Sequence, residues 1–202
     1  MSTATPSTNE RQFTEQGRER KQQLVDAAMA LFTERGYAAT RISDICTEAG
    51  VAKGLFYWYF PTKVDLFTEL VRTMRQRLRR AQADAVDPHA TALDRIVRGA
   101  EASVIFIAEH AHYFALVEGE RADPAIAEAL RDTTRVYLDD VVALVREAQE
   151  AGQVRDDDPR LLAFGVLGTV SSFGNSLRTN QLETSPRELA TFVGAWIERS
   201  LA

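Results

Sequence analysis

Apolar residues along most of the chain recur every three or four positions, the spacing of one face of an α-helix. The first clear stripe runs from Leu24 to Phe32 and is followed by Gly36, a residue that commonly ends helices. Further stripes follow to the end of the chain, and no stretch keeps the two-residue alternation of a strand. The pattern predicts an all-α protein of about nine helices.

Three segments differ in this pattern. Residues 1–17 contain small polar residues and Pro6 but no apolar stripe, so we expect a disordered tail. Residues 18–70 hold one helix, two short helices and the start of a long helix that Thr62 can cap. Residues 71–202 continue as helix after helix. We therefore expect a small N-terminal domain joined by a long helix to a larger helical domain.

The stretch 40–60 has the spacing of a helix-turn-helix. The turn at Ala49-Gly50-Val51 separates two short helices, and neither can bury its apolar side alone. The helix from residue 18 to 35 would cover them. In such units the second helix enters the major groove of DNA, although the same spacing also occurs in purely structural contexts.

The second short helix, residues 52–60, carries side chains suited to DNA. Lys53 stands at its start, where a cation and the helix dipole both favour phosphate. Gly54 permits close approach of the backbone. Tyr57, Trp58 and Tyr59 supply flat groups that can pack against sugars and thymine methyls.

The string TRISDICTEAGVAKGLFYWYFPTKVDLF, residues 40–67, together with the helix before it, closely resembles the DNA-binding segment of TetR-family repressors. The resemblance implies that Thr40 caps the first short helix beside a phosphate and that Ser43 faces the DNA backbone or a base edge. It implies phosphate contacts from Lys53, Gly54, Tyr57 and Lys63, and positions close to bases for Leu55 and Trp58.

Two residues depart from the family pattern. Ala52 stands where a capping Ser or Thr is common, and Leu55 where a Thr is common. Because Leu55 offers DNA only an apolar contact, the operator sequence of other family members cannot be transferred to this chain.

Charge is divided unevenly along the chain, whose net charge is −5. Residues 1–84 hold 13 Lys and Arg against 10 Asp and Glu, and residues 85–202 hold 11 against 19. The first part can therefore approach a polyanion while the second would be repelled. On the long helix, arginines 72, 75, 79 and 80 can contact flanking DNA or pair with the acidic second part.

Other chemistry is sparse. A single cysteine, Cys46, excludes an intramolecular disulfide, and we expect it to be a small buried filler rather than a redox sensor. His110 and His112 point to different helix faces and cannot share a metal. No enzyme motif is present, and we expect no catalytic residue, cofactor or metal.

Without a membrane-spanning segment or a secretory signal, the sequence predicts a cytoplasmic protein.

The last two helices predict a dimer. Apolar and small residues occupy nearly every side of residues 161–177, and a helix that is apolar all round must be covered all round. We expect these helices from two subunits to form a four-helix bundle, the arrangement usual in the family; burial within one subunit is the alternative. The expected interface residues are Leu161, Leu177, Leu189, Phe192, Trp196 and Ile197.

These observations predict a homodimeric repressor that binds a palindromic DNA operator and is released by a small hydrophobic effector. Bulky residues expected to line the effector pocket are Phe106, Tyr113, Phe114, Tyr137, Val170 and Phe173, with polar contacts available from Glu101, Glu118 or Asn175. Two alternatives remain open at this point. One is a helical enzyme or ligand carrier, and the other is a protein-interaction module that uses the aromatic cluster at residues 57–59.

Overall fold

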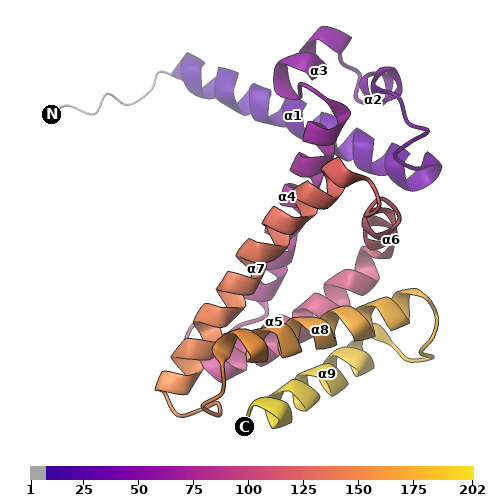
Figure 1. The fold of residues 1–202 in the computed structure, drawn as a ribbon. Coiled ribbons are helices and arrows are strands. Elements are labelled where there is room, and N and C mark those ends of the chain that lie inside the picture. The colour runs from indigo at the N-terminus through magenta and orange to yellow at the C-terminus, as the bar shows by residue number, and fades with distance from the viewer. Residues whose placement is uncertain (1–7) are drawn as a thin grey trace, which may run out of the picture.

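The structure, a computed structural model, describes residues 8–202, and the side chains of residues 15–128, 130–131 and 135–202. The described chain is all-α and contains no strand, as the sequence predicts (Figure 1). Its nine helices are α1 (Thr8–Arg35), α2 (Ile42–Glu48), α3 (Lys53–Tyr59), α4 (Lys63–Asp84), α5 (Ala92–Glu109), α6 (Ala111–Gly119), α7 (Pro124–Glu150), α8 (Pro159–Arg178) and α9 (Pro186–Leu201).

Local chemistry accounts for several helix ends. Thr62 caps α4: its hydroxyl accepts the Asp65 N–H at 3.2 Å, and the Asp65 carboxylate accepts the Thr62 N–H at 2.9 Å. This reciprocal pair satisfies two N–H groups that would otherwise lack partners. After α1 and α2 the chain turns through Gly36 and Gly50, whose φ angles of 82° and 63° are open to glycine at little cost.

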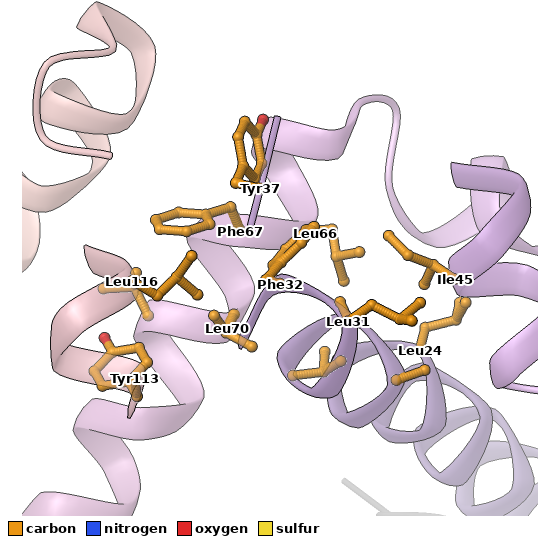
Figure 2. Close-up of a cluster of buried hydrophobic side chains, with 14 of the residues drawn as sticks. Leu24, Leu31, Phe32, Tyr37, Ile45, Leu66, Phe67, Leu70, Tyr113 and Leu116 are labelled. Carbon is orange, nitrogen blue, oxygen red and sulfur yellow. The ribbon is translucent and has the colours of Figure 1, made fainter. Parts of the chain in front are cut away.

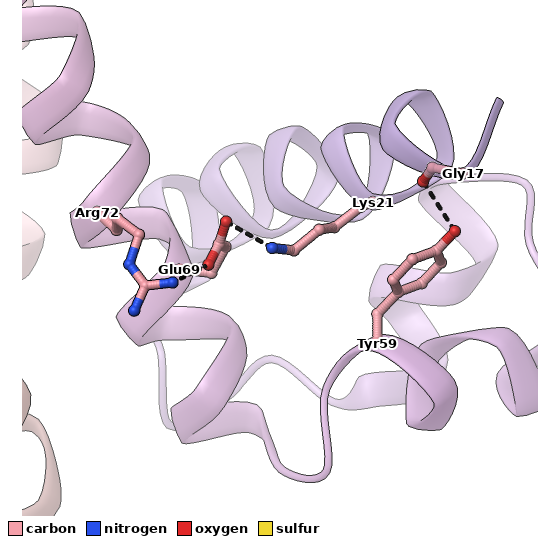
Figure 3. A network of polar contacts seen from close by, with 5 residues as sticks. All are labelled: Gly17, Lys21, Tyr59, Glu69 and Arg72. Carbon is pink, nitrogen blue, oxygen red and sulfur yellow. Dashed lines mark hydrogen bonds and ion pairs between the residues drawn. The ribbon is translucent and has the colours of Figure 1, made fainter. Parts of the chain in front are cut away.

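The first helix begins earlier than the sequence predicts. Residues 1–7 of the expected tail lie outside the described residues, but α1 starts at Thr8, so the expectation is wrong for residues 8–17. Those residues lack an apolar stripe, which is why the pattern does not reveal a helix. The Gly17 carbonyl accepts a hydrogen bond from Tyr59 Oη at 2.8 Å, which ties this part of α1 to the end of α3 (Figure 3).

The first hydrophobic core lies among α1, α2, α3 and the first half of α4, and it also includes α6 and the first turn of α7. Phe32, Phe67 and Ile45 are completely or almost completely buried in it. Tyr113 and Leu116 of α6 face the same cluster beside Phe67 (Figure 2). The packing is therefore continuous across residue 70, where the sequence pattern predicts a domain boundary.

The second core is built around α5, which packs against α4, α7, α8 and α9. Val104, Val145 and Val193 are fully buried there. Figure 1 shows α4 and α7 running from the helix-turn-helix end of the molecule to this second core. Among the described helices, none is long and apolar enough to cross a membrane.

The arginines of α4 pair with acidic residues. Arg75 lies 3.4 Å from the Asp140 carboxylate of α7, and Arg79 pairs with the same carboxylate. Arg72 pairs with Glu69 on its own helix. At these three positions the structure therefore favours ion pairs within the chain over contacts with flanking DNA.

Candidate DNA-binding surface and ligand cavity

The recognition helix α3 is held by one buried side and presents the other to solvent. Phe56 is fully buried, whereas Tyr57 and Trp58 are 48% and 74% exposed. Lys53 and Gly54 are also exposed, and the Lys53 ammonium lies 6.0 Å from the centre of the Tyr57 ring. The helix thus combines one free cation with two large aromatic groups, which suits contact with phosphate, sugar and base.

The C-terminal end of α3 is tied to α1 through Tyr59. The Trp58 ring meets Tyr59 edge-on at 4.5 Å, and Tyr59 is itself bonded to the Gly17 carbonyl. Close by, Lys21 Nζ of α1 lies 2.7 Å from Glu69 of α4 (Figure 3). These contacts hold α1, α3 and α4 in one orientation, so the exposed indole is presented on a rigid support.

Residues at the start of α2 differ in part from the prediction. Ser43 is exposed on α2, as expected of a residue facing DNA. Thr40, however, does not cap the helix: it is buried, and its hydroxyl donates to the Gly36 carbonyl at 2.8 Å. The N-cap is the exposed Arg41, whose N–H donates to the Asp44 carboxylate at 3.0 Å.

Arg41 is a candidate DNA contact that the sequence analysis missed. Its position in the sequence, a cation immediately before the first short helix, could have indicated this contact. The capping role was instead assigned to the adjacent Thr40, because threonine is a common N-cap residue. Leu55 on α3 is half-buried, so only part of its side chain can reach DNA.

Lys63 is used inside the protein. Its ammonium donates to the carbonyls of Tyr37 and Thr40 at 2.7 and 2.9 Å and lies 4.1 Å from the centre of the Tyr37 ring. Burial lowers its pKa, and the Glu120 carboxylate acts in the opposite direction. Lys63 thus anchors the loop after α1 to the start of α4. Two of its three ammonium protons are used in this way, so at most one remains for the expected phosphate contact.

Cys46 is buried beneath the helix-turn-helix surface, which agrees with a packing role. Burial raises the pKa of its thiol, while Lys53 acts in the opposite direction. A protonated, covered thiol is a poor nucleophile, so its environment is unlike that of a redox sensor.

Metal-ligating residues do not gather anywhere in the described part of the chain. His110 stacks on Phe106, with ring centres 4.0 Å apart, and its Nδ1 is bonded to the Phe106 carbonyl at 2.9 Å. This histidine packs within the chain.

A cavity of about 470 Å³ opens among α4, α5, α7 and α8, which is within the size range of sites for small molecules. Most of its wall is apolar. Of the six predicted pocket residues, the structure places Tyr137 and Val170 on this wall. The other apolar and small lining residues are Ala83, Val86, Pro88, Ile96, Gly99, Ala100, Val141, Leu144, Val166 and Leu167.

The remaining four pocket predictions are wrong for this cavity. Phe106, Tyr113 and Phe114 belong to the first core, where they pack under the helix-turn-helix domain. Phe173 meets Phe192 edge-on at 5.6 Å on the α8–α9 side. Bulky aromatic residues have the same helical spacing in a core as around a cavity, so the pattern could not separate the two.

The polar groups of the cavity were also missed. Glu101, Glu118 and Asn175 do not line it; Gln82, Arg79, Arg95, Asp87 and Asp140 do. Gln82 Nε2 donates to Ser103 Oγ at 2.9 Å and to Tyr137 Oη at 2.8 Å. Arg79 pairs with Asp140, and Arg95 with Glu147.

The last two helices present an apolar face to solvent. Leu161, Phe192 and Trp196 are 69%, 50% and 42% exposed, and Phe164, absent from the predicted set, joins them at 54%. Leu177 is half-buried. Leu189 and Ile197, in contrast, are buried in the second core of their own chain and are not available to a partner as predicted.

Comparison with known proteins gives two family matches, one after the other along the chain. Residues 24–70 match the model described as bacterial regulatory proteins of the tetR family. Residues 89–175 match the model described as a tetracyclin repressor-like C-terminal domain. The two matches cover the helix-turn-helix end and most of the helices that form the cavity.

Similar proteins agree with these matches. An uncharacterized HTH-type transcriptional regulator, YhgD, of Bacillus subtilis is 26% identical over 74% of this chain and 79% of its own. The fatty acid metabolism regulator protein of the same organism is 27% identical over 77% of this chain and 81% of its own. The crystal structure of FadR from Bacillus subtilis in complex with stearoyl-CoA superposes with a TM-score of 0.76. That match has 23% identity and covers 90% of this chain and 99% of that one.

Proposed function

The chain belongs to the TetR family of bacterial transcriptional regulators, and on that basis we propose that it is a homodimeric repressor released from a palindromic operator by a small hydrophobic effector. Members of this family bind DNA operators, typically as homodimers that respond to a small molecule. The chain is a transcriptional regulator rather than an enzyme. Because it acts on the bacterial chromosome, we propose that it works in the cytoplasm.

The observation that carries the operator proposal is the exposed face of α3. Trp58 and Tyr57 are 74% and 48% exposed, and Phe56 on the opposite side is fully buried. The exposed Lys53 ammonium lies 6.0 Å from the centre of the Tyr57 ring. An indole left so exposed on a rigid helix costs free energy unless a partner covers it. The neighbouring cation selects a polyanion as that partner.

The homodimer proposal rests on the exposed residues Leu161, Phe164, Phe192 and Trp196 of α8 and α9. A second copy offers the same apolar face, and a twofold axis would cover both faces at once. The pair would hold two α3 helices about 34–36 Å apart, one turn of DNA, and so match an operator with two related half-sites.

The effector proposal rests on the cavity among α4, α5, α7 and α8. Its largely apolar wall suits a ligand with an apolar body. The Bacillus subtilis FadR structure was obtained in complex with stearoyl-CoA, whose long acyl chain is a ligand of that kind. A ligand will release the operator only if it binds the DNA-incompetent conformation more tightly than the competent one.

Selection of chromosomal fragments from the source organism by the purified protein tests the proposal, followed by gel shifts across a salt series. We expect a fragment with two inversely related half-sites, and an affinity that falls as salt rises. Lys53→Ala should weaken binding to all fragments and reduce the salt slope by about one. Arg187→Ala, which removes an exposed cation of α9, is the matched control and should leave both unchanged.

Two outcomes would contradict the repressor assignment. Ligand uptake or turnover without salt-dependent DNA affinity would favour a carrier or an enzyme. Binding of a protein partner through residues 57–59 that survives Lys53→Ala would favour an interaction module.

A further inference from the structure

The polar groups around the cavity divide into a charged rim and an uncharged inner group. Arg79, Arg95 and Asp140 keep 50%, 34% and 41% of their side chains exposed, so they lie where the cavity meets solvent. Arg79 shares the Asp140 carboxylate with Arg75, Arg95 is paired with Glu147, and Arg95 Nε is buried without a hydrogen-bond partner among the described residues. The inner polar groups are Gln82 and Tyr137, with the buried Ser103 behind them.

The hydrogen bonds fix the orientation of the Gln82 amide. Ser103 Oγ donates its single proton to the Gly99 carbonyl at 2.6 Å, so it can only accept from Gln82. The second amide proton goes to Tyr137 Oη at 2.8 Å. Both protons of Gln82 Nε2 are therefore used, and the amide nitrogen must face Ser103.

Within the inner polar group, one acceptor is open and one donor has only a long contact. Within the described chain Gln82 Oε1 has no partner, so it is a free acceptor on the cavity wall. Tyr137 Oη accepts from Gln82, and the nearest group for its own proton, Ser103 Oγ, is 3.5 Å away. The wall thus offers one acceptor and one donor close together, surrounded by apolar side chains.

From this arrangement, and resting on the proposed effector function, we propose that the effector buries an uncharged hydroxyl group at Gln82 and Tyr137. The hydroxyl would donate to Gln82 Oε1 and accept from Tyr137 Oη, with its apolar body against Val141, Val166 and Val170. A carboxylate buried at that point would face the open Oε1 acceptor, to which it cannot donate, whereas the cations of the cavity, Arg79 and Arg95, lie at its rim. A pure hydrocarbon would leave that acceptor without water or a partner.

Displacement of Nile red, an uncharged apolar dye, tests this with three matched probes. The probes are 1-decanol, which donates and accepts; decyl methyl ether, which only accepts; and decanoate, which is charged. For the wild-type chain we expect 1-decanol to bind about tenfold more tightly than the ether, the value of one well-placed hydrogen bond. Decanoate should bind less tightly than 1-decanol.

Three variants assign the preference to residues. Gln82→Leu should abolish the preference for the alcohol over the ether while still binding Nile red. Tyr137→Phe should weaken binding of the alcohol and the ether alike and leave the preference unchanged, because both probes accept from Tyr137 Oη. Gln76→Leu changes an exposed glutamine on the same helix, outside the cavity, and should behave as wild type. Thermal melting of each variant confirms that it is folded.

The outcomes separate this inference from the function on which it rests. Equal binding of alcohol and ether, tightest binding of decanoate, or an unchanged preference in Gln82→Leu would overturn the hydroxyl inference and leave an effector cavity in place. If the wild-type chain takes up no Nile red, the effector proposal itself fails, and the inference fails with it.

Discussion

The molecule exposes a tryptophan on each of two surfaces, and the surroundings of the two side chains differ. Trp58 stands on α3, which also carries the exposed Lys53, and Arg41 and Ser43 are exposed on the neighbouring α2. Trp196 stands on α9 one turn after Phe192, and Leu161 and Phe164 are exposed on α8. The same residue type thus accompanies cations at one end of the chain and other apolar groups at the other.

The residues around an exposed aromatic side chain indicate which kind of partner it contacts. An aromatic group beside cations suits a partner with phosphates and bases, because it can stack while the cations neutralise charge. An aromatic group among apolar neighbours suits an apolar partner, which a second copy of this chain provides. A substitution at one surface should therefore disrupt binding there and leave the other surface intact, so each tryptophan serves as the control for the other.

The largest effect is expected from Trp196→Asp. A carboxylate in the middle of an apolar subunit interface would cost about 2 kcal/mol or more, roughly a 30-fold weakening of dimerisation. Sedimentation equilibrium checks the subunit association, and a gel shift should show loss of operator binding in parallel. Trp58→Asp should leave sedimentation unchanged; a dimer that persists in Trp196→Asp would show that α9 does not form the interface.

The next effect is expected from Trp58→Ala. Loss of the indole should weaken operator binding about tenfold, the size of one lost base-level contact, while the dimer stays intact. Because the side chain is so exposed, its removal should not lower the melting temperature. Fluorescence anisotropy with the selected operator measures the affinity; unchanged affinity would mean that α3 does not present this residue to DNA.

A smaller effect is expected from Lys63→Met, which tests whether Lys63 belongs to the DNA-binding surface around Trp58. The variant removes the donor from the Tyr37 and Thr40 carbonyls, so we expect a loss of about 1 kcal/mol in the free energy of unfolding, measured by urea denaturation. The salt slope of operator binding should stay at the wild-type value. If the salt slope fell by about one while the free energy of unfolding stayed at the wild-type value, Lys63 would contact phosphate after all.

The smallest effect concerns Cys46, which lies beneath the first surface. Burial raises the pKa of the thiol, so at pH 8 it stays protonated and covered in the folded chain. Iodoacetamide should label it at least roughly tenfold faster in urea than in the native protein. Rapid native labelling, or operator binding that is lost on mild oxidation, would identify it as a reactive site.

The sequence was a good guide where local chemistry decides structure. The stripe from Leu24 to Phe32, the stop at Gly36 and the cap at Thr62 all rest on neighbouring residues, and the structure confirms them. The exposure of Tyr57 and Trp58 agrees with their expected contact with DNA, whereas Tyr59, expected to make the same contact, is half-buried and bonded to Gly17.

The missed features depend on contacts between distant segments. Gln82 lies at the cavity because α4 packs against α5 and α7, which places it against Ser103 and Tyr137. The same reason explains Lys63: its acceptors lie more than twenty residues earlier, in the loop after α1. Helical spacing predicts which side of a helix is covered, but it does not name the helix that covers it.

The first core has a practical consequence for anyone who wishes to exchange parts between regulators of this kind. Tyr113, Leu116 and Ile126 come from α6 and the first turn of α7, yet they complete the packing beneath the helix-turn-helix. A chimaera cut at residue 70 would leave Phe67 and Leu70 facing foreign side chains or water. The transferable unit is therefore discontinuous, and a working graft would carry α6 and the first turn of α7 together with the N-terminal helices.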